Sequence, residues 1–153
     1  MQRRLLLMRH AESGWSDSSI TDHQRPLNSK GEKDSTRIAQ TLQRLNWVPN
    51  RVFVSDSKRT LSTLEGMSSV FGEVSSRTME SLYQNPLTTI LECTQKANQG
   101  ETTLILSHNP GIELVLYELT GEFHEMPTAA CALLVEQNGK WHCQQILRPK
   151  ELD

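Results

Sequence analysis

The sequence lacks the features of several common kinds of protein. It holds three cysteines, Cys93, Cys131 and Cys143, and no C-x-x-C pair, so we expect neither a disulfide framework nor a cysteine-based zinc site. The apolar run at residues 5–8 is shorter than the ~7–15 residues of a secretory signal, and no stretch approaches the ~18 of a membrane span. We therefore expect a reduced, cytoplasmic protein without a membrane segment.

Excess charge of one sign is also missing. The formal net charge of −2 argues against nucleic acid or an anionic membrane as the main partner, although it leaves room for a local basic pocket. Internal repeats, low-complexity tracts and long linkers are absent too. The length of 153 residues suits one compact core, so we predict a single domain over residues 1–153.

Apolar runs and helix-capping residues alternate along the chain. We predict strands at Arg4–Arg9, Arg51–Ser55 and Thr102–Ser107, with a weaker one at 76–79. We predict helices capped by Asn28 or Ser29, over 58–70, from Pro86 to Ala97, and from an Asn109 cap to Gly121. The dipeptide Asn138–Gly139 between two extended runs predicts a β-hairpin.

This alternation indicates an α/β fold with three layers. Strands that alternate with helices form a mostly parallel central sheet with helices on both faces, here followed by a C-terminal antiparallel hairpin. Strands buried on both faces need continuous apolar runs, as in "LLLM" and "LILS". Ligands of such sheets bind beyond the carboxyl ends of the strands.

Two histidines lie at those ends. His10 follows the first strand and His108 follows the third clear strand, so neighbouring strands would bring both imidazoles to one point. A single histidine there is most often a solvated loop residue, but two at the ends of core strands favour a functional site.

Three arginines lie near the same predicted edge. Arg9 precedes His10, Arg25 lies in the loop "HQRPLN", and Arg59 begins the helix after the second strand. Surface arginines are usually solvated, yet three at strand ends suggest an anion site because guanidinium groups match phosphate oxygens bidentately. The helix after Asn109 would add backbone N–H donors.

Other phosphate and metal chemistries find little support. The sequence has no G-x-x-x-x-G-K-[ST], G-x-G-x-x-G, H-E-x-x-H or H-x-H motif, and no cysteine followed by a glycine-rich anion loop. A histidine nucleophile inside an arginine cage, without metal or cofactor, remains.

The motifs resemble those of the histidine phosphatase superfamily, which includes the phosphoglycerate mutases. "LLLMRHAESGW" is similar to its R-H-G signature, "SDSKRTLST" to its S-P-x-x-R-A-x-Q-T segment, and "LILSHNPGIELVLYELTG" to its second-histidine segment. Small size and the segments "DHQRPLNSKG", "ESLYQNP", "MPTAACALL" and "LRPKEL" resemble the SixA-type phosphohistidine phosphatase branch. The resemblance implies a phosphoglycerate mutase-like fold with a reduced lid insert.

The resemblance also implies roles for individual residues. His10 would be the nucleophile, and Arg9, Arg25 and Arg59 would hold the phosphoryl oxygens. His108 would donate to the transferring group. In a lesser capacity, the backbone N–H of Asn109 and the hydroxyl of Ser13 would contact a phosphate oxygen.

Two departures from the family pattern affect the chemistry. Ala11 replaces the motif glycine, which matters only if that position needs a positive φ. The larger members carry a glutamate general acid in a longer insert, and no clear equivalent is present. Glu80 is the nearest candidate, and Glu12 follows His10 but does not match the acid's place in the motif.

We therefore expect a metal-independent phosphohydrolase that forms a phosphohistidine enzyme intermediate. Its expected partner is a phosphohistidine-bearing protein, such as a phosphorelay domain, in a signalling pathway, and the chain is expected to be a monomer. Two alternatives remain open: a small-molecule phosphomonoesterase of the same superfamily, and a phosphoprotein-binding module without turnover.

Overall fold

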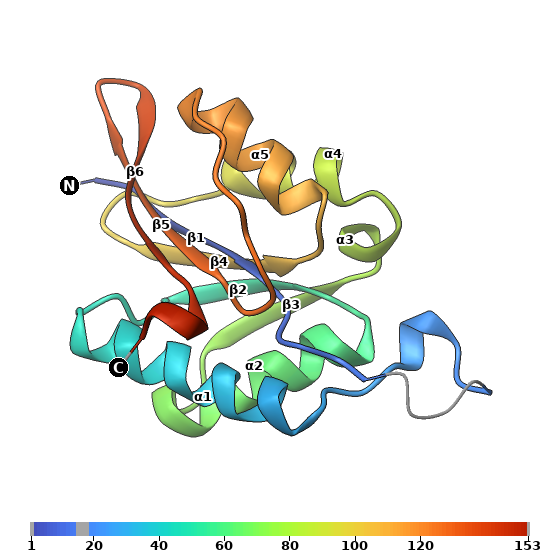
Figure 1. Cartoon of the computed structure of the whole chain (residues 1–153). Helices are drawn as coiled ribbons and strands as arrows, with labels where there is room; N and C mark the ends of the chain where they lie inside the picture. Colours follow the sequence, from blue (N-terminus) through green and yellow to red (C-terminus); the bar gives the residue numbers. More distant parts are fainter. Residues whose placement is uncertain (1, 15–18, 153) are drawn as a thin grey trace.

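One six-stranded sheet organises the chain (Figure 1). The computed structural model describes residues 2–14 and 19–152. The strands are β1 (Arg4–Arg9), β2 (Arg51–Ser55), β3 (Ser75–Met79), β4 (Thr102–Ser107), β5 (Cys131–Gln137) and β6 (Lys140–Leu147). The helices are α1 (Ser29–Arg44), α2 (Lys58–Phe71), α3 (Ser81–Gln84), α4 (Pro86–Thr94) and α5 (Gly111–Thr120), with short 3₁₀ turns η1 (Asp22–Gln24) and η2 (Pro149–Glu151).

The sheet is mostly parallel, as predicted. Its order is β3-β2-β4-β1-β5-β6, and the first four of these strands run parallel. β5 lies antiparallel to β1, and β6 returns antiparallel to β5. The predicted hairpin turn is confirmed: Asn138 and Gly139 have φ of 53° and 76°, the left-handed pair that a tight two-residue turn requires.

Helices cover both faces of this sheet. Figure 1 shows α1 and α2 against one face and α3, α4 and α5 against the other. Alternate residues of β1 serve the two layers: Leu6 and Met8 join the cluster that contains the apolar side of α1, while Leu5 and Leu7 join the cluster beneath α4 and α5. All four are fully buried, and each such side chain contributes about 1.5–3 kcal/mol.

Most helix ends follow the predicted signals. Asn28 caps α1 by accepting a hydrogen bond from the Gly31 N–H at 2.8 Å, and Gly121 ends α5 with a φ of 78°. Gly31 is required for a second reason. A Cβ there would lie 2.1 Å from the Glu12 carbonyl oxygen, so glycine lets α1 pack directly on the loop that follows β1.

Two predicted helix bounds were wrong, and one short helix was missed. α5 begins at Gly111 with Pro110 as its cap residue, so Asn109 lies outside the helix, where its Oδ1 accepts the Glu113 N–H at 3.2 Å. α4 ends at Thr94, because the N–H groups of residues 95–97 donate to the carbonyl three residues back rather than four, so the chain leaves the α-helix there. The short helix α3 was not predicted. None of the helices in residues 2–14 and 19–152 is long and apolar enough to cross a membrane.

Candidate active site

The two predicted histidines meet at the carboxyl ends of β1 and β4. These strands are neighbours, with Arg9 opposite Ser107, and the His10 N–H donates to the Ser107 carbonyl at 3.1 Å. The imidazole centroids of His10 and His108 lie 5.3 Å apart. Each residue is only 6% exposed, so neither is a solvated loop histidine.

Local contacts fix the orientation of His10. Its Nδ1 lies 2.7 Å from the carbonyl oxygen of Ala11, which only accepts, so Nδ1 carries the proton. Its Nε2 is then unprotonated, and its lone pair accepts a hydrogen bond from Nε of Arg59 at 3.3 Å. Ala11 itself is fully buried, donates its N–H to Thr63 Oγ1 at 3.0 Å and does not have a positive φ, so no glycine is needed there.

The loop before β5 holds the backbone of Arg9 and His10 through two hydrogen bonds. The Ala129 N–H donates to the His10 carbonyl at 2.9 Å, and the Arg9 N–H donates to the Ala130 carbonyl at 3.1 Å. Ala129 has a φ of 63°, a conformation that costs a non-glycine residue about 1–3 kcal/mol. Backbone strain at this position is therefore coupled to the placement of His10.

Both imidazoles are held neutral. Burial lowers the pKa of His10 from 6.5 to about 4, and the charges of Arg59, Arg9 and Arg25 add to this effect. Burial also lowers the pKa of His108 to about 3, helped by His10 and Arg59. At neutral pH, His10 therefore presents an unprotonated Nε2.

His108 is oriented by the end of β2. Its Nε2 lies 2.8 Å from Ser55 Oγ, and that hydroxyl also accepts the Ser57 N–H at 3.4 Å. The Ser55 hydroxyl has no other acceptor for its own proton among the described residues, so it donates to Nε2, which places the proton of a neutral His108 on Nδ1. Nδ1 is buried and has no hydrogen-bond partner among the described residues, so it is left to donate to a ligand.

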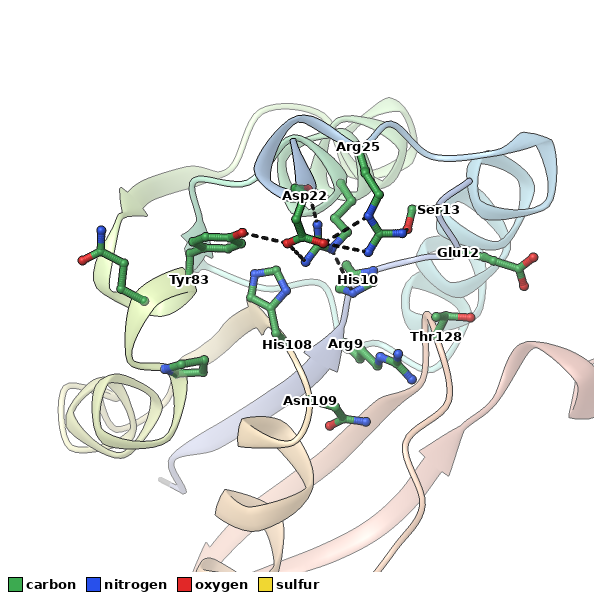
Figure 2. Close-up of a pocket in the computed structure, with 13 residues that line it drawn as sticks. Arg9, His10, Glu12, Ser13, Asp22, Arg25, Tyr83, His108, Asn109 and Thr128 are labelled. Carbon is green, nitrogen blue, oxygen red and sulfur yellow. Dashed lines mark hydrogen bonds and ion pairs between the residues drawn. The ribbon is translucent and has the colours of Figure 1, made fainter. Parts of the chain in front are cut away.

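The three predicted arginines surround this pair. Arg9, Arg25 and Arg59 line one pocket of about 730 Å³ together with both histidines (Figure 2). Arg9 comes from the end of β1 and donates to the Met126 carbonyl at 3.3 Å, while Arg59 comes from the first turn of α2. Arg25 follows η1 and donates to Ser13 Oγ at 2.9 Å. The arrangement provides three cations around a neutral nucleophilic nitrogen, which suits a phosphoryl group.

The two lesser predicted residues also line the pocket, where their side chains contact neighbouring residues, and the role predicted for the Asn109 backbone N–H stays a prediction. Ser13 Oγ accepts from Arg25, so the hydroxyl holds that arginine. The Asn109 amide donates to the Met126 carbonyl at 2.9 Å, and its oxygen accepts from the first turn of α5. The Asn109 side chain therefore ties the loop before β5 to α5.

Sequence reasoning missed Asp22 and Tyr83. The Asp22 carboxylate accepts from Arg59 Nη2 and Arg25 Nε, both at 3.1 Å, and from the Tyr83 hydroxyl at 2.7 Å. Partial burial would raise the pKa of Asp22, but the hydrogen bonds from Tyr83 and Arg59 and the charges of Arg59 and Arg25 lower it to about 2. The sequence signals were indirect: Asp22 lies in "DHQRPLNSKG" and Tyr83 in "ESLYQNP", two segments that resemble the SixA branch, and Asp22 stands three residues before Arg25.

The two glutamates considered as general acids do not reach the histidines. Glu80 is exposed, lies outside the pocket and accepts from Gln84 Nε2 at 2.9 Å. Glu12 lies at the pocket rim, but its carboxylate points away from the histidines in Figure 2, toward Asn28 and Lys30. Within the described ranges, no group of three or more His, Cys, Asp or Glu residues is arranged to hold a metal ion.

The fold and site together define a class of α/β protein that handles phosphoryl groups with paired histidines and arginines. A family model of the histidine phosphatase superfamily (branch 1) matches residues 5–85, over half of the 153-residue chain. The chain belongs to the histidine phosphatase superfamily.

Several known proteins resemble the chain over most of its length. An uncharacterized chloroplastic protein of Arabidopsis thaliana is 33% identical, with the match covering 92% of this chain and 70% of the relative. A protein of Agrobacterium tumefaciens assigned as the phosphohistidine phosphatase SixA superposes with a TM-score of 0.88 at 23% identity, over 97% of this chain and 99% of that one. A phosphoserine phosphatase of Entamoeba histolytica in complex with 3-phosphoglyceric acid gives a TM-score of 0.72 at 13% identity, over 95% and 96% of the two chains.

Proposed function

We propose that this protein is a phosphatase that removes the phosphoryl group from phosphohistidine in proteins, without a metal ion. The observation that carries the proposal is the state of His10: a buried, neutral imidazole whose Nε2 lone pair faces a pocket lined by three arginines. Family membership supports phosphatase activity. The substrate and the metal independence rest on the chemistry of the pocket.

The reaction divides into two steps at His10. In the first step, Nε2 attacks phosphorus, the P–N bond to the substrate imidazole breaks, and the phosphoryl group is transferred to Nε2. The Nδ1–H···O=C bond to Ala11 stabilises the positive charge that develops on the ring. In the second step, water attacks phosphorus, the bond to Nε2 breaks, and inorganic phosphate and neutral His10 are formed.

The other residues act on the transferring oxygens. Arg59 and Arg9 flank His10, and Nδ1 of His108 is placed to donate to an oxygen on the same group. Three guanidinium groups offset the charge of a phosphoryl dianion, which is the role that metal ions fill in other phosphoryl-transfer enzymes. Arg25, the residue after η1, completes the cage.

Proton supply favours P–N bonds over alkyl esters. An alkoxide leaving group must be protonated by a general acid, whereas an imidazole is far less basic and can take its proton from solvent. Asp22 is ionised at neutral pH, Glu80 lies outside the pocket, and Glu12 contacts Asn28 at the pocket rim. The likeness to SixA structures, one of them complexed with tungstate, supports this choice.

The likeness to phosphoserine phosphatase makes a small phosphoester the alternative substrate. The test compares kcat/KM on a phosphohistidine peptide and on 3-phosphoglycerate, for the wild type, His10→Ala and, as control, His124→Ala outside the pocket. We expect the peptide to be preferred, His10→Ala to be inactive but folded, and His124→Ala to match the wild type. Preference for the glycerate ester would refute the substrate class. If neither compound is turned over, the remaining alternative is a phosphoprotein-binding module.

A further inference from the structure

The Asp22 carboxylate lies where substrate oxygens are expected. Its Oδ2 is 3.1 Å from Nη2 of Arg59, and its Oδ1 is 3.1 Å from both Nε and Nη2 of Arg25. The Asp22 carbonyl also accepts from Nη1 of Arg59 at 2.7 Å. Two of the three cage arginines are therefore already bonded to an anion of the protein, as Figure 2 shows for the carboxylate between them.

A carboxylate and a phosphoryl group compete for the same donors. Both present planar pairs of oxygens to a guanidinium fork, and a fork bonded to one is not available to the other. Two negative groups in the same cage also repel each other. Binding of a phosphoryl dianion must therefore displace the Asp22 carboxylate from at least part of the cage.

Tyr83 offers the carboxylate a contact outside the arginines. Its hydroxyl donates to Oδ2 at 2.7 Å, and its ring packs edge-on against the imidazoles of His108 and His23 at centroid distances of 5.4 and 4.8 Å. Tyr83 thus fixes Asp22 at the pocket rim, close enough to return to the arginines once the phosphate has left.

We infer that Asp22 is a built-in competitor for the phosphoryl site, which weakens the binding of inorganic phosphate and so speeds product release. Three arginines without an opposing charge would retain the dianionic product. As phosphate departs, the Asp22 carboxylate takes its place as the hydrogen-bond acceptor of Arg25 and Arg59, so these two arginines keep an anionic partner. The inference rests on the proposed function, in which inorganic phosphate is the product.

The test measures the binding of inorganic phosphate by calorimetry at pH 7 and fixed ionic strength. Asp22→Asn keeps the shape of the side chain and removes its charge, and we expect it to tighten phosphate binding about tenfold or more, because hydrogen bonds to charged groups are the strong ones. The matched control is Asp56→Asn, which also removes a carboxylate nearby. Asp56 contacts His23 at 3.0 Å rather than the arginines, so its variant should bind phosphate like the wild type.

A second variant keeps the inference falsifiable if Asp22→Asn fails to fold. Tyr83→Phe retains the ring packing and removes one hydrogen bond from the carboxylate, so phosphate binding should tighten by less than in Asp22→Asn. The double variant should bind like Asp22→Asn alone, since Tyr83 acts through the carboxylate.

The outcomes separate the inference from the proposed function. Unchanged or weaker phosphate binding by Asp22→Asn would overturn the competitor role and show that the carboxylate only positions the arginines. Tighter binding without turnover of phosphohistidine would support the competitor role and refute the proposed substrate. Phosphate binding no stronger in the wild type than in Arg59→Ala would overturn both.

Discussion

The protonation state of His10 is the property on which nucleophilic attack depends. Lowering the pKa from 6.5 to about 4 amounts to roughly 3 kcal/mol, at about 1.4 kcal/mol for each unit. At pH 7 an unperturbed histidine is about one quarter cationic, whereas a pKa near 4 leaves roughly 0.1% in the cationic form. We expect an NMR titration of the His10 ring protons to show this low pKa in the free enzyme.

The charge of Arg59 is one cause of the low pKa of His10, and a substitution at Arg59 removes it. Its Nε lies 3.3 Å from Nε2 of His10, and its charge lowers the pKa of that imidazole, second among the lowering causes to burial. Arg59→Gln should therefore raise the pKa of His10 but leave it below 6.5. The exposed contacts of Arg148 make Arg148→Gln the control, with no shift at His10. A wild-type pKa at or above 6.5 would refute the neutral nucleophile, and no response to Arg59→Gln would refute the electrostatic coupling.

Three further predictions follow from the same site. Arg59→Ala should lower kcat/KM by about 10²–10³, and by more than Arg25→Ala does, because Arg59 is buried against His10 whereas Arg25 lies on a loop. Arg59→Lys should restore little of the activity. Equal losses in Arg59→Ala and Arg25→Ala would contradict this order. Turnover should survive exhaustive chelation and be inhibited by vanadate, whereas loss with EDTA that one divalent ion restores would contradict the arginine cage. The unfolded chain binds protons on His10 and His108 below about pH 6.5, whereas the native chain binds them only near pH 4 and pH 3. The free energy of unfolding, measured by urea titration in phosphate-free buffer, should therefore fall as the pH drops from 7 to 4. No such fall in the wild type, or the same fall in His10→Ala, would contradict the low pKa values of the two histidines.

The predicted and observed bounds of β1, β2 and β4 agree because burial determines their sequence. A strand covered on both faces carries an unbroken apolar run through its centre, and polar residues flank that run at the strand ends. α3 gave no such signal. It has four residues and one buried side chain, Leu82, so neither periodicity nor capping marks it.

Some residues of the site could be predicted from the sequence and others could not. His10, His108, Arg9 and Arg59 were predictable because parallel strands bring their carboxyl ends to one edge of the sheet. Asp22 and Tyr83 were not, because their contacts join positions 22, 59 and 83, which no local spacing relates. The segment between Phe71 and Thr102 also forms part of the pocket wall through Tyr83 and Pro86.

Asp22 connects substrate choice with product release through a single property, its negative charge. A carboxylate with a pKa of about 2 has no proton to give at neutral pH, so it cannot assist an alkoxide to leave while it holds the arginines. The same charge opposes a second anion in the cage. A phosphohistidine substrate suits both conditions, because its leaving imidazole needs no acid from the enzyme. Replacement of Asp22 by asparagine should therefore leave phosphoryl transfer from phosphohistidine intact and slow the departure of phosphate, whereas a general acid in that position would show the opposite pattern.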